Sequence, residues 1–92
     1  MYALEIKPEA DKIFRKLSKK NRKQLEIIHK KITEIQSNPL REYKFLKNPL
    51  QNYNSLHIDA HFVLIYQIAH VKRTVIIFYF GHHDEAYLWK SV

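Results

Sequence analysis

Two long apolar runs in the second half of the chain restrict its fold more than any other feature. They are Phe62–Ile68 and Thr74–Phe80, joined by the more polar connection Ala69–Arg73. A strand with one solvent-exposed face alternates apolar and polar residues, whereas these runs are apolar on both faces, which is typical of central strands. They therefore predict a hairpin at the centre of a sheet. Helices should cover one face, and a C-terminal segment or a partner should shield the other.

The first forty residues predict one strand and two helices. Residues 1–7 alternate between apolar and polar side chains, as a half-buried strand does. Pro8 suits the first turn of a helix, and apolar residues at helical spacing continue to about Ser18. A second apolar stripe runs from about Arg22 to Ser37, and Asn38-Pro39 ends it. Both stripes need a sheet to cover them, so we expect a helical hairpin packed on the strands.

The order of these elements predicts the fold class. After a linking segment of polar and basic character, residues 40–52, a further short strand is predicted at Tyr53–Ile58. The order βααβββ with a short C-terminal segment predicts an α+β fold, with the hairpin on one face of a mainly antiparallel sheet. With 92 residues, the chain should form a single domain over residues 1–92.

Composition excludes several classes of protein. The chain has no cysteine, which excludes disulfides and thiolate metal sites and suits a reducing compartment. Its N-terminal residues do not resemble a signal peptide, and no apolar run reaches membrane-spanning length. We therefore expect a cytoplasmic protein that does not act at a membrane.

A basic surplus indicates a polyanionic partner. Sixteen Lys and Arg residues face nine acidic ones, for a net charge of +7, and many of them lie in the predicted hairpin. Such a surplus favours a polyanionic partner, which can be nucleic acid, an anionic membrane surface or an acidic protein, and a segregated basic face is more informative than a basic average. A surface that serves only solubility is the alternative. The residues that we expect to hold phosphates are Lys16, Lys19, Lys20 and Lys23.

Chemically reactive side chains gather just after the last apolar run. The segment Gly81-His82-His83-Asp84-Glu85-Ala86-Tyr87-Leu88-Trp89 holds the only glycine and the only tryptophan of the chain. In an antiparallel meander the turn between the second and third strands meets the end of the fourth strand. The histidines that should converge at this edge are His57, His61, His82 and His83. Histidine exchanges protons near neutral pH, so the cluster favours acid–base chemistry over a structural role for each ring.

The whole pattern resembles the RelE/ParE superfamily of toxin–antitoxin toxins. The resemblance rests on the element order, the basic hairpin, Leu64-Ile65-Tyr66 and the ending Gly81 to Tyr87. It implies a ribosome-dependent endoribonuclease (an mRNA interferase) that is neutralised by a small cognate antitoxin. ParE-like members instead inhibit DNA gyrase, so a non-enzymatic inhibitor or a weakened relative is the alternative.

Within the superfamily the chain is similar to the histidine-using YafQ branch. His57, His61-Phe62, His83 and Tyr87 fall at that branch's spacing of catalytic and aromatic residues. Two positions depart from the branch, because its loop histidine is Asn48 here and its aspartate is His61. The strand positions that carry basic residues in RelE are Asn54, Leu56 and Val63 here.

The resemblance also implies roles for these residues. We expect His83 to act as general acid or base, with His57 as its complement and His61 holding the phosphate or sharing the proton transfer. Tyr87 would stack on a base or join the proton network, and Phe62 would stack. His82 would contact RNA or hydrogen-bond the backbone, while Trp89 would pack on the sheet. No cofactor is expected. Adjacent histidines at a strand end should diverge, so no metal is expected either.

Overall fold

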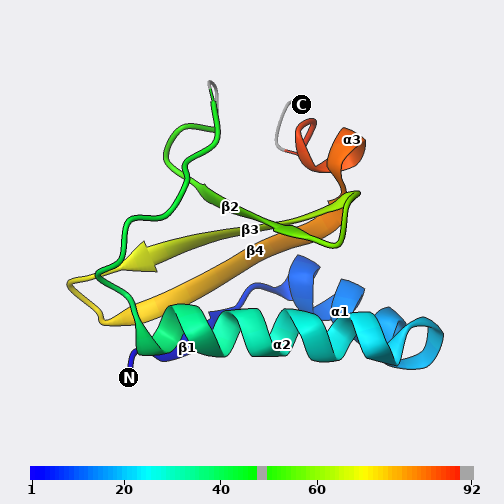
Figure 1. Ribbon diagram of the computed structural model, residues 1–92, viewed down its shortest axis with the longest axis horizontal. Coiled ribbons are helices and arrows are strands. Elements are labelled where there is room, and N and C mark those ends of the chain that lie inside the picture. The colour runs from blue at the N-terminus through cyan, green and yellow to red at the C-terminus, as the bar shows by residue number, and fades with distance from the viewer. Residues whose placement is uncertain (48–49, 90–92) are drawn as a thin grey trace.

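The computed structural model describes residues 1–47 and 50–89 (Figure 1). The elements are β1 (Ala3–Ile6), α1 (Pro8–Lys20), α2 (Arg22–Ser37), β2 (Asn54–Ile58), β3 (Phe62–Ala69), β4 (Thr74–His82) and α3 (His83–Ala86). The predicted α+β class and the βααβββ order are confirmed, with a one-turn helix as the C-terminal segment. Within the described ranges, no helix is long and apolar enough to cross a membrane.

The four strands form one sheet in the order β1-β4-β3-β2. The β2–β3 and β3–β4 pairs are antiparallel, and β1 pairs with β4 in parallel. The two long apolar strands are therefore the central ones, as their patterning predicts. The β2–β3 turn and the end of β4 lie at the same end of the sheet, close to α3 (Figure 1).

Asn21 separates the two helices by itself. Its backbone N–H donates to the carbonyl of Leu17 at 2.8 Å and ends α1, and its side-chain oxygen accepts the N–H of Gln24 at 3.1 Å and caps α2. The predicted break after Ser18 is wrong, because α1 continues to Lys20. Lysine is a good helix former, so Lys19 and Lys20 extend the exposed face of α1.

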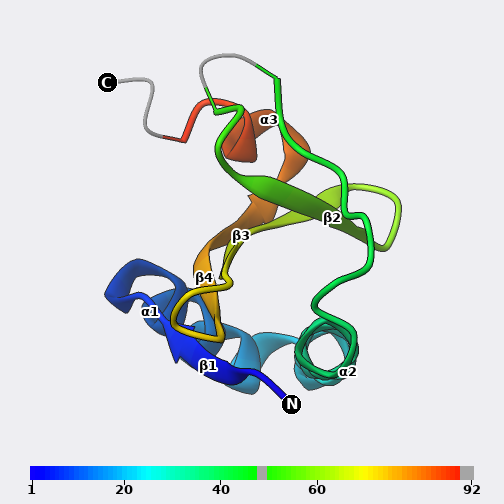
Figure 2. The same cartoon turned by 90° about the vertical axis from the view of Figure 1, so that its left-hand side faces the viewer.

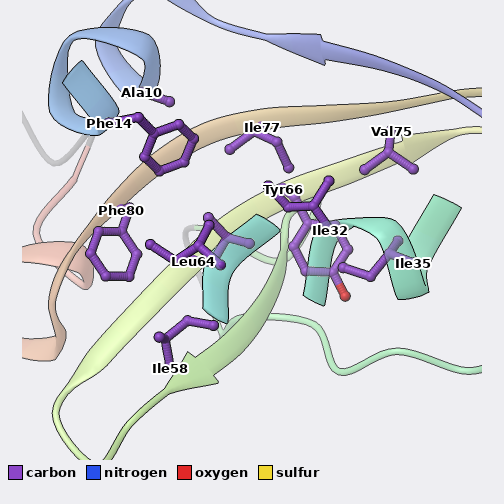
Figure 3. Close-up of a cluster of buried hydrophobic side chains, with 11 residues drawn as sticks. Ala10, Phe14, Ile32, Ile35, Ile58, Leu64, Tyr66, Val75, Ile77 and Phe80 are labelled. Atoms are coloured by element: carbon purple, nitrogen blue, oxygen red, sulfur yellow. The ribbon is translucent and has the colours of Figure 1, made fainter. Parts of the chain in front are cut away.

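The main core lies between the helices and the sheet (Figure 2). Its buried members come from α1, α2 and three strands: Ala10, Phe14, Ile28, Ile32, Ile35, Ile58, Leu64, Tyr66, Val75, Ile77 and Phe80. Tyr66 reaches from β3 toward Ile32 and Ile35 of α2 (Figure 3), and its hydroxyl has no hydrogen-bond partner among the described residues. The core therefore contains the buried ring of Tyr66, whose hydroxyl makes no hydrogen bond to the described residues.

A second, smaller cluster covers the opposite face of the sheet. Leu46 and Leu50, from the segment before β2, pack there with Val63, Ile65 and Ala86. The segment and α3 lie across this face, opposite the two long helices (Figure 2). The sequence predicted only a polar link at residues 40–52 and missed this packing. Ala86 belongs to the C-terminal segment that was expected to shield this face, whereas the cover from Leu46 and Leu50 was not expected.

Trp89 closes the second cluster, as its predicted packing role requires. Its ring stacks on Tyr79 with centroids 6.0 Å apart and meets Tyr53 edge-on at 5.1 Å. Its indole N–H donates to Oε1 of Glu9 at 2.8 Å, which ties the C-terminal segment to the first turn of α1.

Candidate functional site

Three histidine rings meet where the β2–β3 turn approaches the end of β4. His61 precedes β3, His82 ends β4 and His83 begins α3. The ladder pairs Phe62 with His82, and the next link is a hydrogen bond of 2.8 Å from the N–H of His83 to the carbonyl of His61. The ring centroids of His61 lie 6.0 Å from His82 and 6.2 Å from His83. The antiparallel register thus brings together three of the four predicted histidines.

Asp84 contacts the two consecutive histidines. Its Oδ1 lies 2.9 Å from Nδ1 of His83, and its backbone N–H donates to Nδ1 of His82 at 3.3 Å. The predicted backbone role of His82 is therefore present. The expectation that the two side chains diverge is wrong, since their centroids are 4.4 Å apart. The chain turns from extended backbone at His82 into α3, which brings the two rings to the same side.

His57 lines a separate pocket and is not part of the three-histidine cluster. The pocket has a volume of about 470 Å³ and is lined by Lys44, Phe45, Leu46, Lys47, Leu50, Ser55, His57 and Tyr87. No ring contact, hydrogen bond or ion pair joins His57 to His83 in the described part of the chain. Tyr87 borders the pocket one helical turn after His83, and its N–H donates to the His83 carbonyl at 3.2 Å. α3 therefore links the pocket to the histidine cluster.

Lys44 and Lys47 are site residues that sequence reasoning missed. Both line the pocket of His57 and are exposed. They lie in the segment that was read as a link, and nothing local in the sequence relates them to a histidine ten or more residues later. The only feature of the sequence that pointed to these two lysines was the basic character of that segment.

The four hairpin lysines predicted to hold phosphates lie on the surface of the molecule. Lys16, Lys19, Lys20 and Lys23 are all exposed, and none makes an ion pair within residues 1–47 and 50–89. The α1–α2 turn lies at the same end of the molecule as the β2–β3 turn and α3 (Figure 1). The positive charge of the hairpin tip and the histidines therefore share one end.

Phe62 packs against two neighbouring rings. Its ring stacks on Phe80 with centroids 5.5 Å apart and planes 12° apart, and it meets His82 edge-on at 5.8 Å. The ring is half-buried and supports the cluster from the helix side. Packing is the contact that the structure gives it, and stacking on RNA stays a prediction.

The three positions that lack RelE-type basic residues serve the sheet. Asn54 is buried and donates to the carbonyls of Tyr43 and Lys44, at 3.4 and 3.2 Å. Val63 is fully buried, and Leu56 packs against the main core. Positive charge for a phosphate must therefore come from other residues. Asn48, the position of the loop histidine in the YafQ branch, lies outside the described residues.

The single glycine is explained by the aromatic ring two residues before it. A Cβ atom at Gly81 would lie 2.9 Å from two atoms of the Tyr79 ring and hydroxyl. Burial raises the pKa of Tyr79, and the negative charges of Glu85 and Glu9 raise it further. The ring stays neutral and covers Gly81 directly before the histidines.

Comparison with known proteins assigns the chain to a family. Residues 4–87 match the family model described as the ParE toxin of the type II toxin–antitoxin system parDE. The chain belongs to this toxin family. A relative from Methanocaldococcus jannaschii, provisionally named toxin RelE4, is 45% identical over 92 residues, which cover 100% of this chain and 97% of that protein.

Solved toxins share the fold of this ParE-family chain. A metal-bound toxin from Helicobacter pylori has a TM-score of 0.77 and 27% identity, with 92% of this chain and 98% of that one covered. The toxin in the intact Escherichia coli RelBE toxin–antitoxin complex has a TM-score of 0.68 and 26% identity, with coverages of 89% and 96%. The predicted RelE/ParE resemblance is confirmed at the level of the superfamily.

Proposed function

We propose that this toxin is an endoribonuclease that cleaves mRNA at the ribosome by histidine acid–base chemistry. The observation that carries the proposal is the meeting of His61, His82 and His83 at one exposed end of the sheet. RNA cleavage by the 2′-hydroxyl needs a base for that hydroxyl and an acid for the departing 5′-oxygen. Imidazoles can fill both roles at neutral pH.

His83 is the best candidate for one of these two groups. The carboxylate of Asp84 lies 2.9 Å from its Nδ1, which orients the ring and leaves Nε2 for the substrate. His82 caps α3. The nearest other ring that can act as the complement is His61, whose centroid lies 6.2 Å from that of His83. This geometry favours His61 over His57 as the partner of His83, and gives His57 a role in the neighbouring pocket.

The step itself needs no cofactor. The base accepts the proton of the 2′-hydroxyl, whose oxygen attacks phosphorus and forms a 2′,3′-cyclic phosphate. The bond from phosphorus to the 5′-oxygen breaks, and the acid donates a proton to that oxygen. Charge on the phosphate rises during this step, so nearby cations stabilise the transition state. Lys44 and Lys47 line the neighbouring pocket with His57 and Tyr87, and they are the cations that we propose for this role.

The hairpin lysines extend the basic surface away from the scissile phosphate. They are exposed, unpaired among the described residues and at the histidine end. Phosphate contacts of this kind position a nucleic acid without reading its sequence. We assign them to the ribosome and its bound message.

A cognate antitoxin is the second partner that we propose. The related Escherichia coli toxin was solved in a toxin–antitoxin complex. The +7 net charge of this chain favours an acidic antitoxin segment. Phe45 and Tyr87 are exposed residues that line the pocket, and the exposed Leu88 follows Tyr87; such a segment would cover them.

A gyrase inhibitor without enzymatic activity is the competing candidate. The family model that matches is that of ParE, and the strand positions basic in RelE are occupied by sheet-packing residues. This candidate requires no proton transfer by histidine. Activity of the histidine variants therefore separates the two functions.

The deciding experiment is cleavage mapping by primer extension during in vitro translation. Wild type, His83→Gln, His61→Gln and His57→Gln are compared, with His29→Gln, an exposed histidine of α2, as the matched control. Loss of an acid or base should lower the rate about 10²- to 10⁴-fold for His83→Gln. Melting temperatures show whether each variant is folded.

Two outcomes overturn the proposal. One is wild type that cuts no message yet blocks gyrase supercoiling, which assigns the competing function. The other is a folded His83→Gln protein with full cleavage activity, which removes the histidine mechanism. A folded His83→Gln protein that has lost cleavage, beside an active His29→Gln control, supports it.

A further inference from the structure

We propose that His61, His82 and His83 form a binding site for one divalent transition-metal ion of the zinc class. The proposal rests on the geometry of these side chains and does not require RNA cleavage, although a bound ion would occupy rings that the proposed function uses for proton transfer.

The three imidazoles already bring ligand atoms together. One ring nitrogen from each histidine lies within 4.8 Å of the other two. Nitrogens bound to one tetrahedral zinc ion at about 2.0–2.1 Å lie roughly 3.3 Å apart, so the set must contract by roughly 1.5 Å. His61 is exposed and the other two rings are half-exposed, so they can rotate toward an ion without unpacking the core.

Asp84 supplies the outer contacts that such a site needs. Metal-bound histidines usually direct their second ring nitrogen to a carboxylate or to the backbone. Nδ1 of His83 lies 2.9 Å from Oδ1 of Asp84, so a protonated Nδ1 can donate to this carboxylate and Nε2 is free to bind an ion. Nδ1 of His82 accepts the N–H of Asp84 at 3.3 Å, so this ring must exchange that contact for Oδ2 of Asp84, 3.6 Å away, before its Nε2 binds. The carboxylate also lowers the net charge of an ion bound among three neutral ligands.

The ligand set identifies the class of metal. Three imidazoles with a position open to solvent suit zinc, copper or nickel, whereas calcium and magnesium require oxygen ligands. The exposed side of His61 leaves the fourth position to water or to another ligand. No other group of three histidine or acidic residues converges in this way within the described ranges.

Two contacts position parts of the site before an ion binds. The hydrogen bond from the His83 N–H to the His61 carbonyl measures 2.8 Å and joins the two segments that carry the ligands. Phe62 packs edge-on against His82 at 5.8 Å and limits its motion toward the helices. The hydrogen bond from His83 to His61 therefore keeps these two residues near each other while their rings turn toward an ion.

The experiment is calorimetric titration of the complete, untagged chain with ZnCl₂. We expect one ion per wild-type chain. His61→Gln should bind at least about tenfold more weakly because it loses a ligand, and Asp84→Asn should lose about 10- to 100-fold as an outer-shell change. His29→Gln and His70→Gln retain the three ligands and should match wild type. Absorption of a Co²⁺ complex reports whether the wild-type ion is tetrahedral.

His57→Gln separates this inference from the proposed function. It lies outside the three-histidine group, so it should bind Zn²⁺ like wild type whatever its effect on cleavage. Equal Zn²⁺ affinity in wild type and folded His61→Gln overturns the metal site, as does a wild-type chain that binds no Zn²⁺. Circular dichroism of each variant establishes that a lost signal does not come from unfolding.

Discussion

Gln24 donates a hydrogen bond from Nε2 to Oδ2 of Asp59 at 3.2 Å, joining the start of α2 to the β2–β3 turn. Gln24 is buried, and Asp59 holds the turn with a positive φ of 57°. His61 follows Asp59 by two residues, and Lys23 precedes Gln24. One contact between side chains therefore fixes the basic hairpin tip relative to the histidines.

We expect this contact to couple the hairpin to the turn by about 1 kcal/mol. The double-mutant cycle uses Gln24→Ala and Asp59→Gly, because glycine tolerates the positive φ and removes only the carboxylate. Urea unfolding of the four proteins gives the coupling free energy. Asp59→Asn, which keeps an acceptor oxygen and tolerates the same φ, should cost less than Asp59→Ala. A coupling free energy of zero would mean that the contact does not hold in solution.

The hairpin lysines should determine the salt dependence of RNA binding. Lys23→Ala should lower the slope of log affinity against log salt by about one if Lys23 contacts a phosphate. The matched control is Lys72→Ala, because Lys72 is an exposed lysine in the β3–β4 connection, at the opposite end of the molecule (Figure 1). Filter binding of ribosomes or single-stranded RNA at several salt concentrations measures both slopes. Equal slopes for the two variants would mean that Lys23 contacts solvent and no phosphate.

Tyr66→Phe should leave the protein as stable as wild type or stabilise it by about 1 kcal/mol. The hydroxyl is buried without a partner among the described residues, so its removal ends a desolvation cost. Thermal melting at neutral pH measures the change. A large loss of stability would show that the hydroxyl is hydrogen-bonded in solution.

The same variant should resist alkali. Burial, with a smaller contribution from Tyr43, raises the pKa of Tyr66 above its ordinary value of 10.0. Because the folded state favours the neutral phenol, this contribution to stability is complete below pH 10 and is lost as pH rises beyond that value. Tyr66→Phe should therefore lose less stability than wild type above pH 10. Some loss should remain in the variant, since the pKa of Tyr79 is also raised.

Gly81→Ala should destabilise the protein by about 1–3 kcal/mol through overpacking. The added methyl group would lie 2.9 Å from the Tyr79 ring, which is stacked on Trp89. In a Tyr79→Leu background that ring is absent, and the same substitution should cost much less. Urea unfolding of both pairs measures the two costs, and equal costs would place the effect in the backbone instead.

The fold was predictable where a single element carries its own pattern. Ile28, Ile32 and Ile35 recur at helical spacing, and Asn38-Pro39 stops the helix, so α2 was predicted with its observed bounds. The uninterrupted apolar runs identified β3 and β4 as central, and meander topology followed from their adjacency. That topology also brings His61 to His82 and His83, although their catalytic roles stay predictions.

Other features depend on contacts that no local pattern encodes. Leu46 and Leu50 belong to a segment without a clear strand or helix pattern, and only the completed sheet gives them a surface to cover. The nearness of Lys44 to His57 likewise requires that segment to cross the sheet. The close approach of His82 and His83 depends on a change of backbone conformation between strand and helix, which alternation alone does not reveal.

The parallel pairing of β1 with β4 has a consequence for synthesis of the chain. Ala3 aligns with Thr74, so β1, the first strand to be synthesised, stays unpaired until β4 has been synthesised. The histidine cluster likewise joins residue 61 to residues 82 and 83. A nascent chain held on a translating ribosome therefore has neither a finished sheet nor a histidine cluster. We therefore expect that the chain cannot act at the ribosome that synthesises it until β4 has emerged from the exit tunnel.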